Sequence, residues 1–175
     1  MMRPALNLGR RRTELMNQPS PIKIKMVPTL SVMIASLSPA FPIVINYPVL
    51  PPLGAMVFLG WRLLQRHIWF PWSGVVLGFF NDLANGTPGT ATLTWPMMQL
   101  IMDLVDQRLP WRDYHTDWRL GSMLITLYLL LALTIANYTG GRTTVIFIMP
   151  QIIISILLFP LCIRVCGALD QWRLR

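Results

Sequence analysis

The chain has 175 residues, of which 54% are hydrophobic and 13% are charged, and its formal net charge is +8. Soluble domains carry about 25% charged residues, so this composition excludes an ordinary soluble domain and predicts a membrane protein that crosses the bilayer several times. Arginines at the edges of apolar segments are what the positive-inside rule requires, so the basic charge does not indicate a nucleic-acid partner.

The apolar segments predict an all-α, polytopic membrane protein with a single domain of about six transmembrane helices at 26–163. Residues 1–25 are expected to form a basic, disordered cytoplasmic tail with affinity for anionic membrane lipid. Residues 164–175 are expected to form a second basic cytoplasmic tail. The predicted spans are 26–45, 48–64, 70–87, 90–107, 119–138 and 143–163.

A proline-containing connector without charge separates the first two segments. Pro28 lies in the first turn of the first segment, and Pro39 and Pro42 are expected to bend or end it. The apolar part of the second segment, 53–64, is shorter than the about 20 residues that a span needs. Three interpretations stay open: a full second span that includes connector residues, a short span in a locally thinned bilayer, or a re-entrant hairpin in which neither segment fully crosses.

Tryptophans and arginines mark the turn before the third segment. Arg62 and Arg66 are expected to lie in this polar turn. Trp61, Trp69 and Trp72 predict an aromatic belt around it at the membrane interface.

The third segment repeats small residues every four positions and carries one acid. A helix presents Gly74, Gly78, Asp82 and Gly86 on one face. Small residues let another helix approach closely, and an ionisable group at membrane depth is a functional candidate. Asp82 has three candidate roles: a hydrogen-bonding group that holds the bundle together, a polar pivot for partner binding or conformational coupling, or part of a proton or substrate pathway. Residues 85–89 predict a turn.

The fourth segment ends in a polar cluster. Gln99, Asp103 and Asp106 are spaced four and three apart, so they share one side of a helix. The helix dipole disfavours negative charge at a C-terminus. We therefore expect the two aspartates to pair with Arg108 or Arg112.

An aromatic cluster occupies the following loop. Trp111, Tyr114 and Trp118 are spaced three and four apart, so a short helix places them on one face beside Arg112. This face is either an anchor that lies flat in the membrane interface or a cytoplasmic docking surface for a partner.

The sequence contains no pattern that indicates catalysis, a cofactor or a metal site. His67 and His115 lie among charged loop residues, without a cysteine or second histidine at metal-ligand spacing. There is no phosphate-binding glycine loop and no nucleophile elbow. We expect a protein that is not an enzyme.

The basic residues predict the orientation. With six spans and both termini in the cytoplasm, fourteen of the fifteen Lys and Arg residues lie inside, and only Arg142 lies outside. The N-terminal tail and the turn with Arg62 and Arg66 then share one side. An even number of crossings, or a hairpin, must separate them.

A chain of this layout with Gly-x3-Gly-x3-Asp-Leu-x2-Gly-x-Pro in its third segment resembles the MreD family of bacterial rod shape-determining membrane proteins. The resemblance is specific over 74–89 and covers most of the remaining chain in layout only. The chain lacks the arginine usual at the entry to the second span and the leucine usual before the last glycine of the motif. The residues that carry the resemblance are Gly74, Gly78, Asp82, Leu83, Gly86, Pro88 and Gly89.

The resemblance implies a non-catalytic scaffold in the cell inner membrane that serves the cell-wall elongation machinery. The implied partners are MreC, the actin-like MreB filament, the glycosyltransferase RodA and its class B penicillin-binding transpeptidase. The implied fold is similar to that of the substrate-binding membrane subunits of energy-coupling-factor vitamin transporters. The alternative function is such a small-molecule-binding subunit, with a ligand near Asp82 and Asn85. The predicted helix-packing or partner face comprises Gly74, Gly78, Asp82, Gly86, Pro88 and Gly89.

Overall fold

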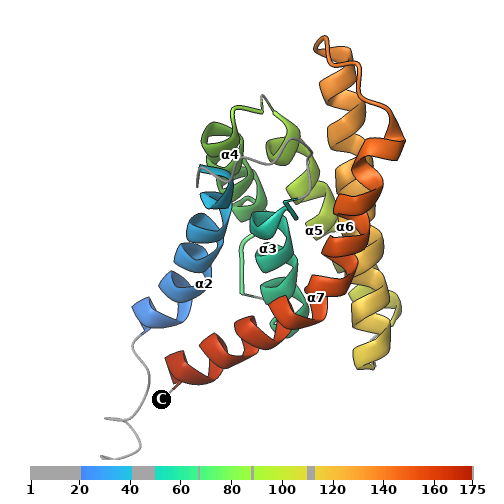
Figure 1. Cartoon of the computed structure of the whole chain (residues 1–175). Coiled ribbons are helices and arrows are strands. Elements are labelled where there is room, and N and C mark those ends of the chain that lie inside the picture. Colours follow the sequence, from blue (N-terminus) through green and yellow to red (C-terminus); the bar gives the residue numbers. More distant parts are fainter. Residues whose placement is uncertain (1–20, 41–49, 67, 88, 110–112, 175) are drawn as a thin grey trace, which may run out of the picture.

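The computed structural model describes residues 21–40, 50–66, 68–87, 89–109 and 113–174. These residues form six α-helices and one 3-10 turn, η1 (Ser38–Ala40), with no strand among them (Figure 1). The prediction of an all-α fold is confirmed. The helices are α2 (Pro21–Ser36), α3 (Leu53–Leu64), α4 (Ser73–Asn85), α5 (Thr90–Arg108), α6 (Tyr114–Tyr138) and α7 (Val145–Leu174).

Three helices extend beyond the predicted spans. Helix α2 begins at Pro21, inside the predicted tail, so Pro28 lies within the helix and not in its first turn. Helix α6 begins at Tyr114 and includes part of the predicted loop. Helix α7 continues to Leu174, so the predicted C-terminal tail is helical. Hydropathy marks only the apolar part of a helix, and the backbone hydrogen bonds continue past it.

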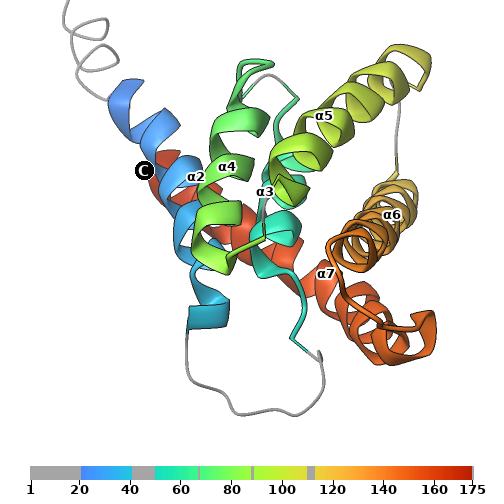
Figure 2. The same ribbon diagram turned by 90° about the horizontal axis from the view of Figure 1, so that it is seen from above.

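The short helix α3 is the central element of the bundle. Viewed from above, it lies among the other helices, and it contacts α2, α6 and α7 (Figure 2). A helix that is surrounded by protein does not need the about 20 apolar residues of a lipid-exposed span. Its buried residues are Gly54, Ala55, Met56, Phe58, Leu59, Gly60, Trp61 and Arg62.

An aromatic stack joins α3 to α5 and to the chain before α4. The Phe58 ring stacks on Trp69 and on Trp95, with 4.7 Å between ring centroids and an interplanar angle of 23° in each pair. Trp61 is fully buried and Trp69 is half-buried, whereas Trp72 is exposed. The predicted aromatic belt is therefore wrong for Trp61, because the packing of α3 draws its side chain into the core. Trp69 packs partly buried against that core.

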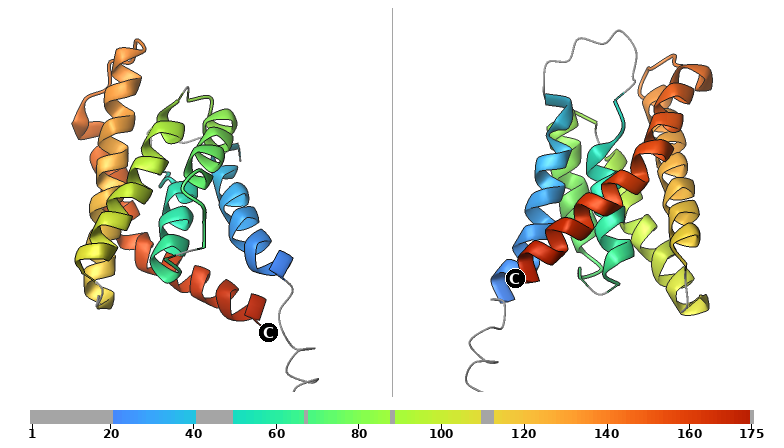
Figure 3. Two further views of the ribbon diagram at one scale, coloured as in Figure 1. Left: turned by 180° about the vertical axis from the view of Figure 1, so that it is seen from behind. Right: turned by 60° about the horizontal axis from the view of Figure 1, so that its bottom comes forward.

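Helix α7 crosses the bundle from α6, past α3, to the start of α2 (Figure 3). Near its end, Arg173 is buried, lies 5.1 Å from the Trp61 ring centroid and pairs with Asp170 at 2.6 Å. Cation–π contacts of this kind stabilise by about 0.5–2 kcal/mol. The segment predicted to be a tail therefore places Cys166 and Arg173 in the interior of the bundle, whereas Val165 and Trp172 are exposed.

Two helices have the length and composition to cross a membrane. Among the described residues these are Tyr114–Tyr138 and Val145–Arg173. The segments Lys25–Ser36 and Leu53–Leu64 are apolar but shorter. In Figure 1 the α4–α5 and α6–α7 turns lie at one end of the bundle, and the start of α2, the end of α3 and the end of α7 lie at the other.

We predict that Phe58→Ala destabilises the protein by about 3 kcal/mol, because it removes a fully buried ring and both aromatic stacks. The matched control is Phe79→Ala, since the Phe79 side chain is 56% exposed, and its expected effect is below about 0.5 kcal/mol. The unfolding midpoint of the detergent-solubilised protein measures the difference. Equal midpoints for the two variants would contradict the central position of α3.

Candidate functional site

Asp82 lies in the last turn of α4, and its side chain is buried. The carboxylate Oδ1 accepts hydrogen bonds from the Ala91 N–H at 2.8 Å and from the Thr87 hydroxyl at 3.1 Å. Oδ2 accepts from the Thr92 N–H at 2.8 Å and from the Thr92 hydroxyl at 2.6 Å. Both oxygens are thus directed at the chain that follows α4.

These hydrogen bonds cap helix α5. The first N–H groups of a helix have no partner inside it, and a side chain at the N-cap position usually accepts from them. The N-cap of α5 is Gly89, which has no side chain. Asp82 supplies the missing acceptor from the preceding helix, and its charge lies at the positive end of the α5 dipole.

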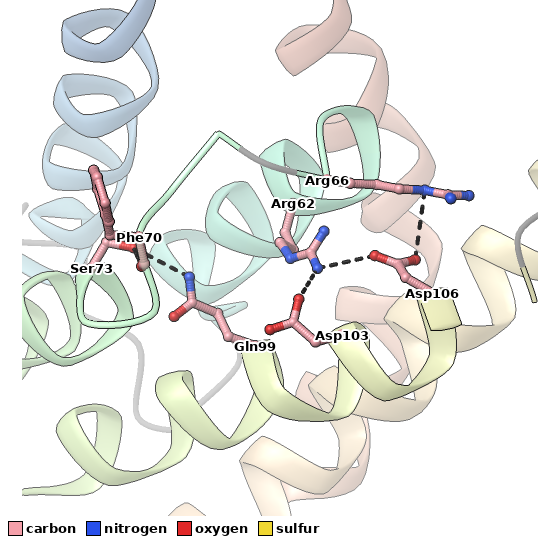
Figure 4. A network of polar contacts seen from close by, with 7 residues as sticks. All are labelled: Arg62, Arg66, Phe70, Ser73, Gln99, Asp103 and Asp106. Atoms are coloured by element: carbon pink, nitrogen blue, oxygen red, sulfur yellow. Dashed lines mark hydrogen bonds and ion pairs between the residues drawn. The ribbon is translucent and has the colours of Figure 1, made fainter. Parts of the chain in front are cut away.

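Gln99 performs the corresponding task for α4. The N-cap of α4 is Trp72, which makes no capping hydrogen bond with its side chain. The Gly74 N–H donates to Gln99 Oε1 at 3.2 Å. The Gln99 amide donates to Ser73 Oγ at 3.2 Å (Figure 4). Each of the two helices therefore receives its cap from the other.

Gly74 and Gly78 permit this arrangement because they let α5 approach the α4 backbone. A Cβ atom on Gly74 would lie 2.6 Å from Gln99 Oε1 and 3.0 Å from the Pro96 nitrogen. A Cβ atom on Gly78 would lie 2.5 Å from the Ala91 carbonyl oxygen. Atoms of a larger residue would overlap there, so the predicted glycine face packs against α5 of the same chain.

Gly86 and Gly89 belong to the turn and not to the packing face. Their φ angles are +67° and +76°, a backbone conformation that glycine adopts without strain. A Cβ atom on either residue would meet nothing within 4 Å. The four-residue spacing therefore describes a packing face only as far as Asp82. Pro88 lies outside the described residues.

The aspartates at the end of α5 pair with arginines at the end of α3, which the sequence did not predict. The Arg62 guanidinium contacts the Asp103 carboxylate and lies 3.0 Å from Asp106 Oδ2 (Figure 4). Arg66 Nε lies 3.8 Å from Asp106 Oδ1. Sequence spacing did not indicate Arg62 and Arg66, because α3 and α5 are far apart in sequence and only their packing brings the four side chains together. The other predicted partner, Arg112, lies outside the described residues.

The burial of Arg62 makes its partners necessary. The side chain of Arg62 is 4% exposed, and those of Asp103 and Asp106 are 49% and 12% exposed. A buried charge without a partner destabilises the fold by several kcal/mol. The Arg62 guanidinium therefore needs the two acids that α5 places next to it. Arg62 thus lies in α3, inside the bundle, and not in the predicted polar turn.

The predicted aromatic face of 111–118 is only partly described, because Trp111 and Arg112 lie outside the described residues. Tyr114 is 50% exposed. Trp118 is half-buried, and its indole N–H donates to the Ile156 carbonyl of α7 at 3.3 Å. Trp118 therefore joins α6 to α7 and does not share an exposed face with Tyr114.

Of the three candidate roles of Asp82, the geometry favours the first, a hydrogen-bonding group that holds two helices together. Four donors engage the carboxylate, so it has little capacity left for a substrate. No group of three or more metal-ligating side chains is present in the described part of the chain. Sequence reasoning missed the capping role, although Gly89 before Thr90 offered a signal, since glycine cannot supply a capping side chain.

We predict that Asp82→Leu destabilises the protein by about 3 kcal/mol, because it leaves the buried Ala91 N–H and the Thr92 N–H without an acceptor. Asp82→Asn keeps one acceptor oxygen and is expected to cost about half as much. Thr87→Val is the control, since the Thr87 bond is the longest of the four and its residue is exposed. Thermal unfolding in detergent gives the ranking. Asp82→Leu with the midpoint of Thr87→Val would refute the capping role.

We also predict that Asp106→Asn is more destabilising than Asp103→Asn. The Asp106 side chain is 12% exposed and the Asp103 side chain 49%. Solvent screens the more exposed pair, so its loss costs below about 1 kcal/mol, whereas loss of the buried acid costs about 2–3 kcal/mol. Unfolding midpoints at low and high salt test this order, and a reversed order would contradict it.

Comparisons of the chain with known proteins identify no relative from which the role of the site could be inferred. No family model, no curated protein and no solved structure matches the chain. The resemblance to MreD therefore rests on the residues of 74–89 and on the layout of the apolar segments.

Proposed function

We propose that the protein is a non-catalytic inner-membrane scaffold of the cell-wall elongation machinery, as the resemblance to MreD implies. The proposal rests on the structural roles of the residues in the glycine and aspartate motif of α4. Gly74 and Gly78 receive α5, and Asp82 caps it, so the charge in the motif is engaged in holding two helices together. A motif with this role suits a rigid scaffold better than a reaction site.

The proposal includes six membrane spans with both termini in the cytoplasm. Large apolar side chains on the outer faces of α2, α4 and α5 support it, because such surface is stable against lipid and unfavourable in water. The distribution of basic residues supports the orientation. The exposed apolar residues on these helices include Leu30, Ile34, Val76, Phe79, Leu83, Leu93, Met97, Leu100 and Leu104.

The proposed partners are MreC, MreB, RodA and the class B transpeptidase that works with RodA. Because Gly74 and Gly78 already pack against α5, contact with transmembrane helices of these partners is assigned to the outer apolar faces of α2, α4 and α5. Contact with the MreB filament is assigned to the basic cytoplasmic end of the bundle.

We predict that depletion of the protein in its own bacterium makes rod-shaped cells round, and that a wild-type copy restores the rod. A Thr87→Val copy should also restore it, whereas an Asp82→Leu copy should fail because the α4–α5 unit is destabilised. Microscopy of cell width and length gives the measurement, with membrane levels of each variant measured in parallel.

A second readout separates the scaffold from the transporter alternative. Tagged protein from solubilised membranes should recover MreC and RodA in greater amount than an unrelated multi-span membrane protein does. If rods persist after depletion while growth comes to require an added vitamin, the scaffold proposal is wrong and the protein is a transporter subunit.

A further inference from the structure

A cavity of about 360 Å³ lies at the end of the bundle that holds the α4–α5 turn. Its walls come from the end of α2, the start of α3, the end of α4, the second half of α6 and the start of α7. Binding sites for small molecules occupy about 300–1,000 Å³ and are mostly apolar with a few polar groups. The cavity is large enough for a compact organic molecule.

Three polar side chains on the cavity wall are more than nine-tenths buried. Ser36 is 1% exposed, Asn81 is 5% exposed and Tyr128 is 8% exposed. The Ser36 hydroxyl has no hydrogen-bond partner among the described residues. Buried polar groups in proteins nearly always have a partner, so this hydroxyl is a feature that the packing of the helices does not explain.

Gly54 brings two of these groups to one point of the wall. A Cβ atom on Gly54 would lie 2.5 Å from Ser36 Oγ and 2.8 Å from Asn81 Oδ1. The absence of a side chain at Gly54 therefore lets a hydroxyl and an amide come together beside the apolar walls. The group formed by Ser36, Asn81 and Tyr128 both donates and accepts hydrogen bonds.

The cavity has no charged side chain among its described lining residues. Asp82, the neighbour of Asn81 in sequence, directs both carboxylate oxygens at α5. A charged ligand would lose its hydration and gain no counter-charge, which costs several kcal/mol. The lining therefore selects against ions.

We propose that this cavity binds an uncharged, mostly apolar small molecule whose carbonyl, amide or hydroxyl group bonds to Ser36, Asn81 and Tyr128. The apolar frame of the ligand would lie against side chains such as Leu53, Leu129 and Leu133. The site is separate from the Asp82 cap, and the proposal does not rest on the scaffold function.

The test uses the full chain in lipid nanodiscs and naphthalene-2-carboxamide as the probe. Equilibrium dialysis, with empty nanodiscs subtracted, is expected to give one saturable site per chain. Naphthalene-2-carboxylate has the same frame with a charge, and it should bind about tenfold more weakly or worse.

Two variants locate the site. Ala132→Trp fills the cavity from α6 without adding a buried charge and should reduce binding about tenfold or more, whereas Ala168→Trp, at an exposed alanine of α7 outside the lining, should leave it unchanged. Asn81→Leu should weaken the carboxamide about tenfold and leave binding of bare naphthalene unaffected. Thermal unfolding of each variant verifies that it is folded.

Three outcomes would overturn the proposal. These are no saturable binding of the carboxamide, equal binding by wild type and a folded Ala132→Trp variant, or equal affinity for the carboxamide and the carboxylate.

Discussion

The contact between the Asp82 carboxylate and the first turn of α5 fixes the geometry on which the rest of the bundle depends. Backbone N–H groups at a buried helix start must find an acceptor. Gly89 cannot supply one, and Asp82 does so across the turn. Gln99 caps α4 in return, and this exchange requires the backbones to lie close, which is why Gly74 and Gly78 carry no side chain. The two reciprocal caps and the two glycines therefore act together to hold α4 against α5.

With α4 and α5 held as a unit, α3 can occupy the centre of the bundle. Trp95 of α5 stacks on Phe58 of α3, and the acids at the end of α5 neutralise Arg62. Helix α7 closes the other side, where Arg173 lies over Trp61. The buried Arg62 pairs with acids of α5, and the buried Asp82 accepts hydrogen bonds from the start of α5, so polar contacts as well as apolar packing specify how these helices lie.

The two ends of the bundle have different chemistry. The end that holds Arg62, Arg66 and the α5 acids is charged, and the opposite end contains an uncharged cavity beside Asn81 and Tyr128. The proposed scaffold would need a fixed shape and surfaces for its partners, and the interhelical caps and ion pairs would supply that rigidity. The exposed apolar faces of α2, α4 and α5 provide the surface on which neighbouring transmembrane helices or lipid would pack.

The amino-acid sequence determined the all-α class, one helix for each apolar segment and the small-residue face of α4, because hydropathy and four-residue spacing are local properties. It could not determine that Asp82 caps α5, that the buried Arg62 pairs with Asp103 and Asp106, or that Trp61 and Trp118 point inward. Those facts depend on which helices become neighbours. The tertiary structure decided them, because the same carboxylate or indole is a surface group or a core group according to what packs beside it.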